Sequence, residues 1–136
     1  MASKKKVPIA KQRKRLEKKL DTLWSEVVKL QAHNKCELCG ADSTLNSHHI
    51  FSRGRKNTRW NLNNGVALCV IHHMWKGAHS TNFEDQERFH KWLNEYRGKD
   101  NLEQLRTDSH VAVKNTLQDL QCIEVALKFE KEKYLL

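Results

Sequence analysis

The sequence lacks any apolar run long enough to cross a membrane, and its apolar content is low throughout. A transmembrane helix needs about 20 apolar residues in succession, and the first fifteen residues, MASKKKVPIAKQRKR, contain no apolar run of the length that a secretory signal needs. We therefore expect no membrane partner and a cytoplasmic location. Hydrophobic residues make up 38% of the 136 residues. So thin a core predicts additional support, for which a structural metal ion is the obvious candidate.

Proline is almost absent, and no internal repeat occurs. The one proline, Pro8, suits the start of a helix because its missing N–H would be unpaired in the first turn anyway. From there to about Ala32, apolar residues recur every three or four positions, which predicts a helix with one apolar face. The first turns of this helix are almost purely basic, so we expect them to project from the body. The length indicates a single domain.

Acidic residues are nearly missing from the N-terminal arm. Residues 1–20 hold nine Lys/Arg and a single acidic residue, Glu17. A second basic excess, with a net charge of +4, covers residues 34–79, where most of the cysteines and histidines lie. Basic charge beside metal-ligand residues indicates a polyanionic partner or substrate. For the arm alone, a solubilising tail is the alternative.

Cysteines are few, and three of the four have metal-ligand spacing. Cys36 and Cys39 form Cys-x-x-Cys, and Cys69 and His72 repeat that spacing about thirty residues later. In an intracellular protein such pairs indicate metal ligands rather than disulfides. Together they predict a closed, structural Cys₃His zinc site. The fourth cysteine, Cys122, is expected to be a small hydrophobe, buried or half-buried on a helix.

Other histidines surround this pattern without belonging to it. His48 and His49 are adjacent, and His73 directly follows His72. One step along a helix turns a side chain by about 100°, so the neighbours His72 and His73 can serve two different metal sites. The pair His48 and His49 is harder to place, because neighbours on a strand point to opposite faces unless the strand bends or ends. We expect three further histidines to be ordinary surface or internally satisfied residues: His33, His90 and His110.

The rest of the pattern predicts an α+β, mostly helical fold. Residues 43–51 (STLNSHHIF) and 63–69 (NNGVALC) read as strands with a basic loop between them, and Val66 and Leu68 share one face of the second strand. After the second strand the chain is expected to become helical.

Two capping patterns predict where later helices start. Thr81 and Glu84 have capping-box spacing for a helix that carries an aromatic face and ends at Gly98. Thr116 and Asp119 open the last helix in the same way, and a short helix is expected between these two.

The string CELC…SHHIF…TRWNLNNGVALCVIHHMWK resembles the HNH, or ββα-metal, nuclease family. His48 and His49 match the dipeptide at the end of the family's first strand, and Asn64 precedes the second zinc pair by five residues. His73 follows that pair directly, with Lys76 three residues further on. The pattern is similar to phage-type, NinG-like HNH proteins, and the His-His dipeptide resembles colicin-type DNases. The resemblance implies a zinc-stabilised ββα-metal core over residues 33–98, between a basic N-terminal arm and helix (1–32) and a C-terminal helical extension (99–136).

The resemblance also implies a role for each matched residue. His49 would be the general base, His48 and His73 would bind one catalytic divalent metal, and Asn64 would brace the loop that holds the base. In the colicin-type pattern a further histidine follows His73 by one turn. Here that position is occupied by Gly77, and His79, two residues later, is the candidate third ligand. Nitrogen ligands favour Mn²⁺, Ni²⁺ or Zn²⁺ over Mg²⁺.

The implied activity is hydrolysis of DNA phosphodiester bonds, by nicking or double-strand cleavage, to 5′-phosphate and 3′-hydroxyl ends. Little sequence specificity is expected, because the basic residues would contact the phosphate backbone. A monomer is favoured, with a phage or recombination protein as a further partner and the host cytoplasm as location if the chain is phage-encoded. The alternative is a zinc-stabilised nucleic-acid-binding or phage assembly module without cleavage. The expected DNA-binding residues are Arg53, Arg55, Lys56, Arg59, Lys76, Lys14 and Arg15.

Overall fold

The computed structural model describes residues 5–135, so that Lys4 of the basic arm and Leu136 of the C-terminal extension lie outside the described residues. The fold is α+β and mostly helical, with one two-stranded antiparallel sheet. Among the described residues, no helix is both long and apolar enough to cross a membrane. The elements are α1 (Ile9–Gln31), β1 (Leu45–His49), the short 3₁₀ turn η1 (Leu62–Asn64), β2 (Gly65–Cys69), the π-helical turn η2 (Ile71–Trp75), α2 (Phe83–Arg97), α3 (Lys99–Ser109) and α4 (Leu117–Lys133).

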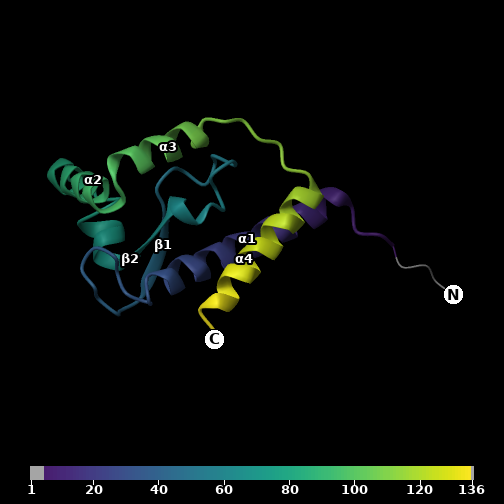
Figure 1. Ribbon diagram of the computed structural model, residues 1–136, viewed down its shortest axis with the longest axis horizontal. Coiled ribbons are helices and arrows are strands. Elements are labelled where there is room, and N and C mark those ends of the chain that lie inside the picture. Colours follow the sequence, from purple (N-terminus) through teal and green to yellow (C-terminus); the bar gives the residue numbers. More distant parts are fainter. Residues whose placement is uncertain (1–4, 136) are drawn as a thin grey trace.

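Helix α1 forms as the apolar spacing predicts, and α4 packs along it (Figure 1). The basic first turns of α1 do not project freely, which corrects the expectation from sequence. Arg13 Nη2 donates to the carbonyl of Asn115 (2.6 Å), and Lys19 Nζ lies 2.9 Å from Glu124 Oε2. The reason is that the apolar face of α4 needs a partner, and α1 supplies it over most of its length.

The C-terminal helix belongs to the main core. Thr116 and Asp119 form the expected capping box at its start. Leu120 and Leu127 of α4 are buried in the same cluster as Trp24 of α1. Segments from the two ends of the chain therefore complete one core. Cys122 is exposed on the outer face of α4, which corrects the expectation that it is buried or half-buried.

The two strands lie between helices, and every residue of β2 is buried. Val66 and Leu68 share one face, as expected, and pack with Phe89 of α2, whereas Ala67 faces the cluster of α1 and α4. Gly65 allows the close approach of β2 to α1, because a Cβ there would lie 2.4 Å from Val28 Cγ2. The sheet is thus held between α1 on one side and α2 on the other.

The chain after β2 forms a single π-helical turn, where sequence predicted only that it becomes helical. Lys76 N donates to the carbonyl of Ile71 (2.7 Å), five residues earlier. Gly77 then lets the chain fold back tightly, because a Cβ at that position would lie 1.7 Å from the carbonyl oxygen of His72.

Helix α2 starts one residue later than the predicted capping box. Asn82, not Thr81, is the N-cap, and its side-chain oxygen accepts from the backbone N–H groups of Glu84 (2.9 Å) and Asp85 (3.2 Å). A cap at Asn82 satisfies two of the unpaired N–H groups of the first turn. The helix ends at Gly98, which has a φ of 87°.

The aromatic face of α2 is narrower than the sequence predicts. Phe89 and Leu93 are buried, whereas Phe83 and Tyr96 are exposed. These outer positions lie at the edges of the apolar stripe, where the small sheet no longer covers them.

Candidate functional site

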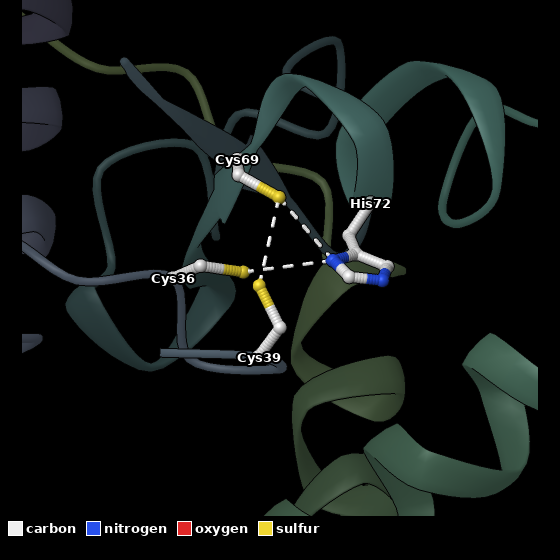
Figure 2. A group of neighbouring side chains, drawn as sticks. All are labelled: Cys36, Cys39, Cys69 and His72. Atoms are coloured by element: carbon white, nitrogen blue, oxygen red, sulfur yellow. Dashed lines mark hydrogen bonds between the residues drawn. The ribbon is translucent and has the colours of Figure 1, made fainter. Parts of the chain in front are cut away.

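Three cysteines and one histidine converge where the hairpin meets the turn after β2 (Figure 2). Cys36 and Cys39 lie in the loop that follows α1, Cys69 ends β2, and His72 lies in η2. Their ligand atoms all lie within 4.8 Å of one another. The spacing read from sequence therefore corresponds to one cluster of four residues that could hold a metal ion.

The distances within this cluster suit tetrahedral coordination. Cys39 Sγ and Cys69 Sγ are 3.8 Å apart, and His72 Nδ1 lies 3.2 Å from Cys69 Sγ and 4.0 Å from Cys36 Sγ. Metal–ligand bonds of the lengths found for zinc give tetrahedral S–S edges of about 3.8 Å and S–N edges of about 3.6 Å. The cluster is therefore compatible with structural zinc.

Backbone contacts shape the loop that carries the first two cysteines. Gly40 has a φ of 76°, and its N–H donates to the carbonyl of Cys36 (2.7 Å). Glu37 ties the same loop to β2, because its N–H donates to the carbonyl of Ala67 (2.9 Å) and its carboxylate accepts from Ala67 N (2.6 Å). Arg97 of α2 contacts the same carboxylate at 3.2 Å.

The backbone around Cys36 favours the ionised form of its thiol. Its burial acts to raise the pKa, but hydrogen bonds from the backbone around Cys69, Cys39 and Leu38 outweigh burial, so the pKa lies below its ordinary value. A thiolate is the form of cysteine that binds a metal.

A second cluster consists of His48, His73 and His79, and their ligand atoms also lie within 4.8 Å of one another. The ring of His48 is centred 5.3 Å from that of His73 and 4.9 Å from that of His79, and the last two are 4.8 Å apart. His48 comes from β1, His73 from η2 and His79 from the loop after η2. Side by side along η2, His72 and His73 therefore belong to two different clusters.

The π-helical turn explains why His79 joins this cluster. In a regular α-helix, residues six apart lie about 240° apart around the axis. Here the N–H of Ala78 donates to the carbonyl of His72 and that of His79 to the carbonyl of His73, both at 2.9 Å. These wide loops bring His79 back over His73. The sequence signal that could have indicated this is Gly77, the only residue type that fits against the His72 carbonyl.

Two observations test whether the second cluster fits a metal ion. Within residues 5–135, the Nδ1 atom of His73 is buried without a hydrogen-bond partner, and an unpaired buried polar atom is costly unless something binds it. Burial, together with the nearby imidazoles of His79, His73 and His49, lowers the pKa of His48 to about 3. Burial also lowers the pKa of His73. The neutral rings of His48 and His73 carry the lone pairs that metal ions need.

His49 faces away from this cluster on the other side of β1. Its ring stacks on that of Trp24, with centroids 3.8 Å apart and planes at 10°. Its Nε2 lies 3.0 Å from the carbonyl oxygen of Arg59. A carbonyl can only accept, so Nε2 carries the proton and Nδ1 keeps a free lone pair. Burial lowers the pKa of His49 despite this hydrogen bond, which favours the neutral ring.

His48 and His49 nevertheless line the same cavity. This cavity has a volume of about 460 Å³ and is also lined by His79, Phe51 and Phe89. The strand ends at His49. The rings of the two neighbours nevertheless lie in different surroundings, His48 in the three-histidine cluster and His49 on Trp24.

Asn64 is fully buried and holds the loop that follows β1. Its Oδ1 accepts from Phe51 N (2.8 Å), and its Nδ2 donates to the carbonyls of Phe51 (3.0 Å) and Thr58 (3.1 Å). These three bonds satisfy an otherwise costly buried amide and fix both ends of the loop.

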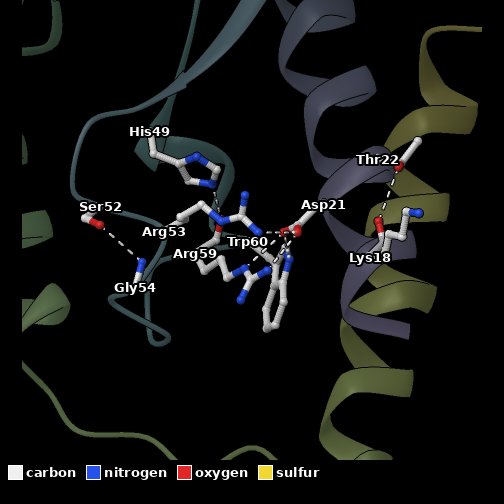
Figure 3. A network of polar contacts seen from close by, with 9 residues as sticks. All are labelled: Lys18, Asp21, Thr22, His49, Ser52, Arg53, Gly54, Arg59 and Trp60. Atoms are coloured by element: carbon white, nitrogen blue, oxygen red, sulfur yellow. Dashed lines mark hydrogen bonds and ion pairs between the residues drawn. The ribbon is translucent and has the colours of Figure 1, made fainter. Parts of the chain in front are cut away.

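Asp21 of α1 is the centre of a polar network that the sequence did not indicate (Figure 3). Its carboxylate accepts from Arg59 Nε (3.0 Å), Arg59 Nη2 (2.7 Å) and Trp60 Nε1 (2.9 Å). Arg53 Nη2 lies 3.3 Å away. Nothing in the sequence signals these contacts, because an acidic residue on a helix reads as a solvated position.

The basic residues expected to bind DNA are not equivalent. Arg53, Arg55 and Lys56 are exposed in the loop between the strands, Lys76 is exposed after η2, and Lys14 and Arg15 are exposed on the first half of α1. Arg59 differs, because its side chain is only 13% exposed and is held by Asp21. The Arg59 guanidinium is therefore paired within the protein.

Comparison of the chain with protein-family models, with curated proteins and with solved structures found no match.

Proposed function

We propose that this protein is a metal-dependent HNH-type endonuclease or nickase that hydrolyses DNA phosphodiester bonds. The observation that carries the proposal is the three-histidine cluster with its unpartnered His73 Nδ1. Two of its members, His48 and His79, line one cavity with His49, whose Nε2 is held by the Arg59 carbonyl. A purely structural protein gives no reason for three imidazoles to face one another beside a cavity that two of them, His48 and His79, also line. The sequence pattern of the HNH family supports the same assignment.

In this proposal the two clusters have different tasks. Cys36, Cys39, Cys69 and His72 hold a structural zinc ion that ties the two strands and η2 into a ββα-like core. His48, His73 and His79 hold one catalytic divalent ion, for which Mn²⁺, Ni²⁺ or Zn²⁺ suit the nitrogen ligands better than Mg²⁺. When bound, that ion would stabilise charge on the phosphate and on the leaving oxygen.

The remaining steps belong to side chains of this chain. His49 Nδ1 takes a proton from the attacking water, while its Nε2–H stays on the Arg59 carbonyl. Asn64 keeps the loop that contains this carbonyl in place. Arg53, Arg55, Lys56 and Lys76 would contact phosphates at the site, and Lys14 and Arg15 phosphates further along the DNA. The products would carry 5′-phosphate and 3′-hydroxyl ends.

The test is a plasmid-nicking assay of the full chain across Mn²⁺, Ni²⁺, Zn²⁺ and Mg²⁺, combined with metal analysis. His49→Ala should abolish cleavage while both metals stay bound. His73→Ala should lose cleavage and the second metal. His110→Ala, which removes an exposed histidine far from both clusters in sequence, is the matched control and should behave as wild type.

Cleavage at the wild-type rate by His49→Ala would show that the base is assigned wrongly. Tight DNA binding without cleavage under any metal would favour the alternative, a zinc-stabilised nucleic-acid-binding module. Absence of both would favour a phage assembly module, which light scattering with candidate partners would examine.

A further inference from the structure

To act as a base, the His49 ring must be fixed in its plane and in its rotation within that plane, and residues of α1 contribute to both. Stacking on Trp24 fixes the plane of the His49 ring, and the hydrogen bond from Nε2 to the Arg59 carbonyl fixes its rotation within that plane. The Trp24 ring is itself held, because its Nε1 donates to the carbonyl of Asn61 at 2.9 Å. Asn64 holds the neighbouring carbonyl of Thr58, and the remaining question is what holds Arg59 itself.

The carboxylate of Asp21 binds the end of the loop that follows β1 to α1. It binds the guanidinium of Arg59 in a bidentate pair and also accepts from the indole of Trp60. Bidentate carboxylate–guanidinium pairs fix geometry as well as adding energy. Asp21 and Trp24 are three residues apart and therefore lie on the same face of α1. One face of α1 thus supports the His49 ring directly and its hydrogen-bond acceptor indirectly.

We infer that Asp21 is a positioning residue for His49, acting through Arg59 on the carbonyl that holds the His49 Nε2–H. The contacts explain why a carboxylate is needed. The Arg59 side chain is only 13% exposed, and a guanidinium left largely buried without its partner would draw the loop outward into water. The carbonyl would move with it, and His49 would lose the contact that selects the Nε2–H tautomer. The kinetic part of this inference rests on the proposed function, whereas the tautomer part does not.

The direct measurement is the tautomer of His49 in the full-length, zinc-loaded protein, read from the ¹⁵N chemical shifts of its ring at neutral pH. In wild type we expect the Nε2–H form. In Asp21→Asn, which keeps the shape and removes the charge, we expect a mixture of tautomers. We also expect kcat for nicking to fall about 10- to 100-fold, the range typical when a group that holds a metal ligand in place is removed, with KM little changed.

Two further variants keep the test decisive if Asp21→Asn folds poorly. Asp21→Glu retains the carboxylate and should restore the Nε2–H form at least in part. Arg59→Gln removes the other half of the pair, and a double variant of Asp21→Asn and Arg59→Gln should lose no more rate than either single variant, because both act through one contact.

The matched control is Glu26→Gln, which removes another ion pair of α1, the one with Lys131 Nζ at 2.6 Å on α4. It should leave the tautomer and the nicking rate unchanged. The inference is overturned if Asp21→Asn keeps the Nε2–H tautomer, or if Glu26→Gln alters it equally. If the wild-type protein does not cleave DNA, the proposed function fails, and the tautomer measurement still decides the role of Asp21.

Discussion

Replacing Gly77 by alanine should disturb both the Cys/His cluster and the three-histidine cluster at once, because this glycine closes the turn that they share. A Cβ at position 77 would lie 1.7 Å from the carbonyl oxygen of His72, 2.5 Å from its carbonyl carbon and 2.9 Å from its Cα. All three are backbone atoms, which cannot swing aside as a flexible side chain can. The turn must therefore open, and the hydrogen bonds from Ala78 N to His72 O and from His79 N to His73 O must lengthen or break.

The expected cost follows from forced overpacking, which is about 1–3 kcal/mol in well-packed sites. For domains near this size each kcal/mol lowers Tm by roughly 2–8 °C. Thermal unfolding followed by circular dichroism measures this loss. Metal analysis of the same samples should show a reduced content at both clusters, because His72 belongs to one and His79 to the other.

Gly54→Ala is the control for this substitution. A Cβ at Gly54 would meet only Ser52 Oγ, at the ordinary contact distance of 3.6 Å. This variant should keep the wild-type Tm and metal content. If Gly77→Ala also kept both, the tight turn and its role in joining the clusters would be refuted.

Two further perturbations address the first cluster and the Asp21 network. Removing metal with a strong chelator should unfold the hairpin region, since structural zinc sites contribute their binding energy to folding. The control Cys122→Ser, which alters an exposed cysteine, should leave metal content and Tm unchanged. Retention of the wild-type Tm after complete metal removal would contradict the structural role of the first cluster. Burial acts to raise the pKa of Asp21, but hydrogen bonds from Arg59 and Trp60 and the charges of Arg59 and Arg53 outweigh it, so the pKa lies below its ordinary 3.8. The stability that ionised Asp21 adds is therefore present above pH 3.8 and is lost as the pH falls through its folded pKa. The difference in unfolding free energy between wild type and Asp21→Asn, measured by urea titration, should be largest near neutral pH and shrink in acid; a difference independent of pH would exclude an electrostatic role.

Features governed by local patterns could be predicted from the sequence. Pro8 and the apolar spacing that follows it predict the extent of α1 to within a residue at either end, and the Thr116 capping box predicts the start of α4. The spacing of Cys36, Cys39, Cys69 and His72 predicts their cluster, because two ligands three residues apart can reach a single ion. The division between His72 and His73 is also predictable, since one step along any helix-like turn changes the face.

Features that depend on tertiary context could not be predicted. The contact between Asp21 and Arg59 joins residues 38 positions apart, and neither residue type signals it. The sequence names His79 only as a candidate ligand, because its place beside His73 depends on the two hydrogen-bonded turns, each joining residues six apart, at the end of η2. The cap of α2 at Asn82 rather than Thr81 reflects two neighbouring residues that can both cap, so packing decides between them.

The shared turn η2 also explains how so small a core can support two clusters. Because His72 and His73 are consecutive, anything that fixes the backbone at His72 fixes it at His73 as well. A metal bound by the cysteine cluster would hold His72 from one side, and the backbone bonds of Ala78 and His79 hold the turn from the other. Binding at one cluster would then lower the ordering cost at the other, and by linkage that coupling must be reciprocal. The basic surface around the hairpin would gain a rigid site without a larger apolar core.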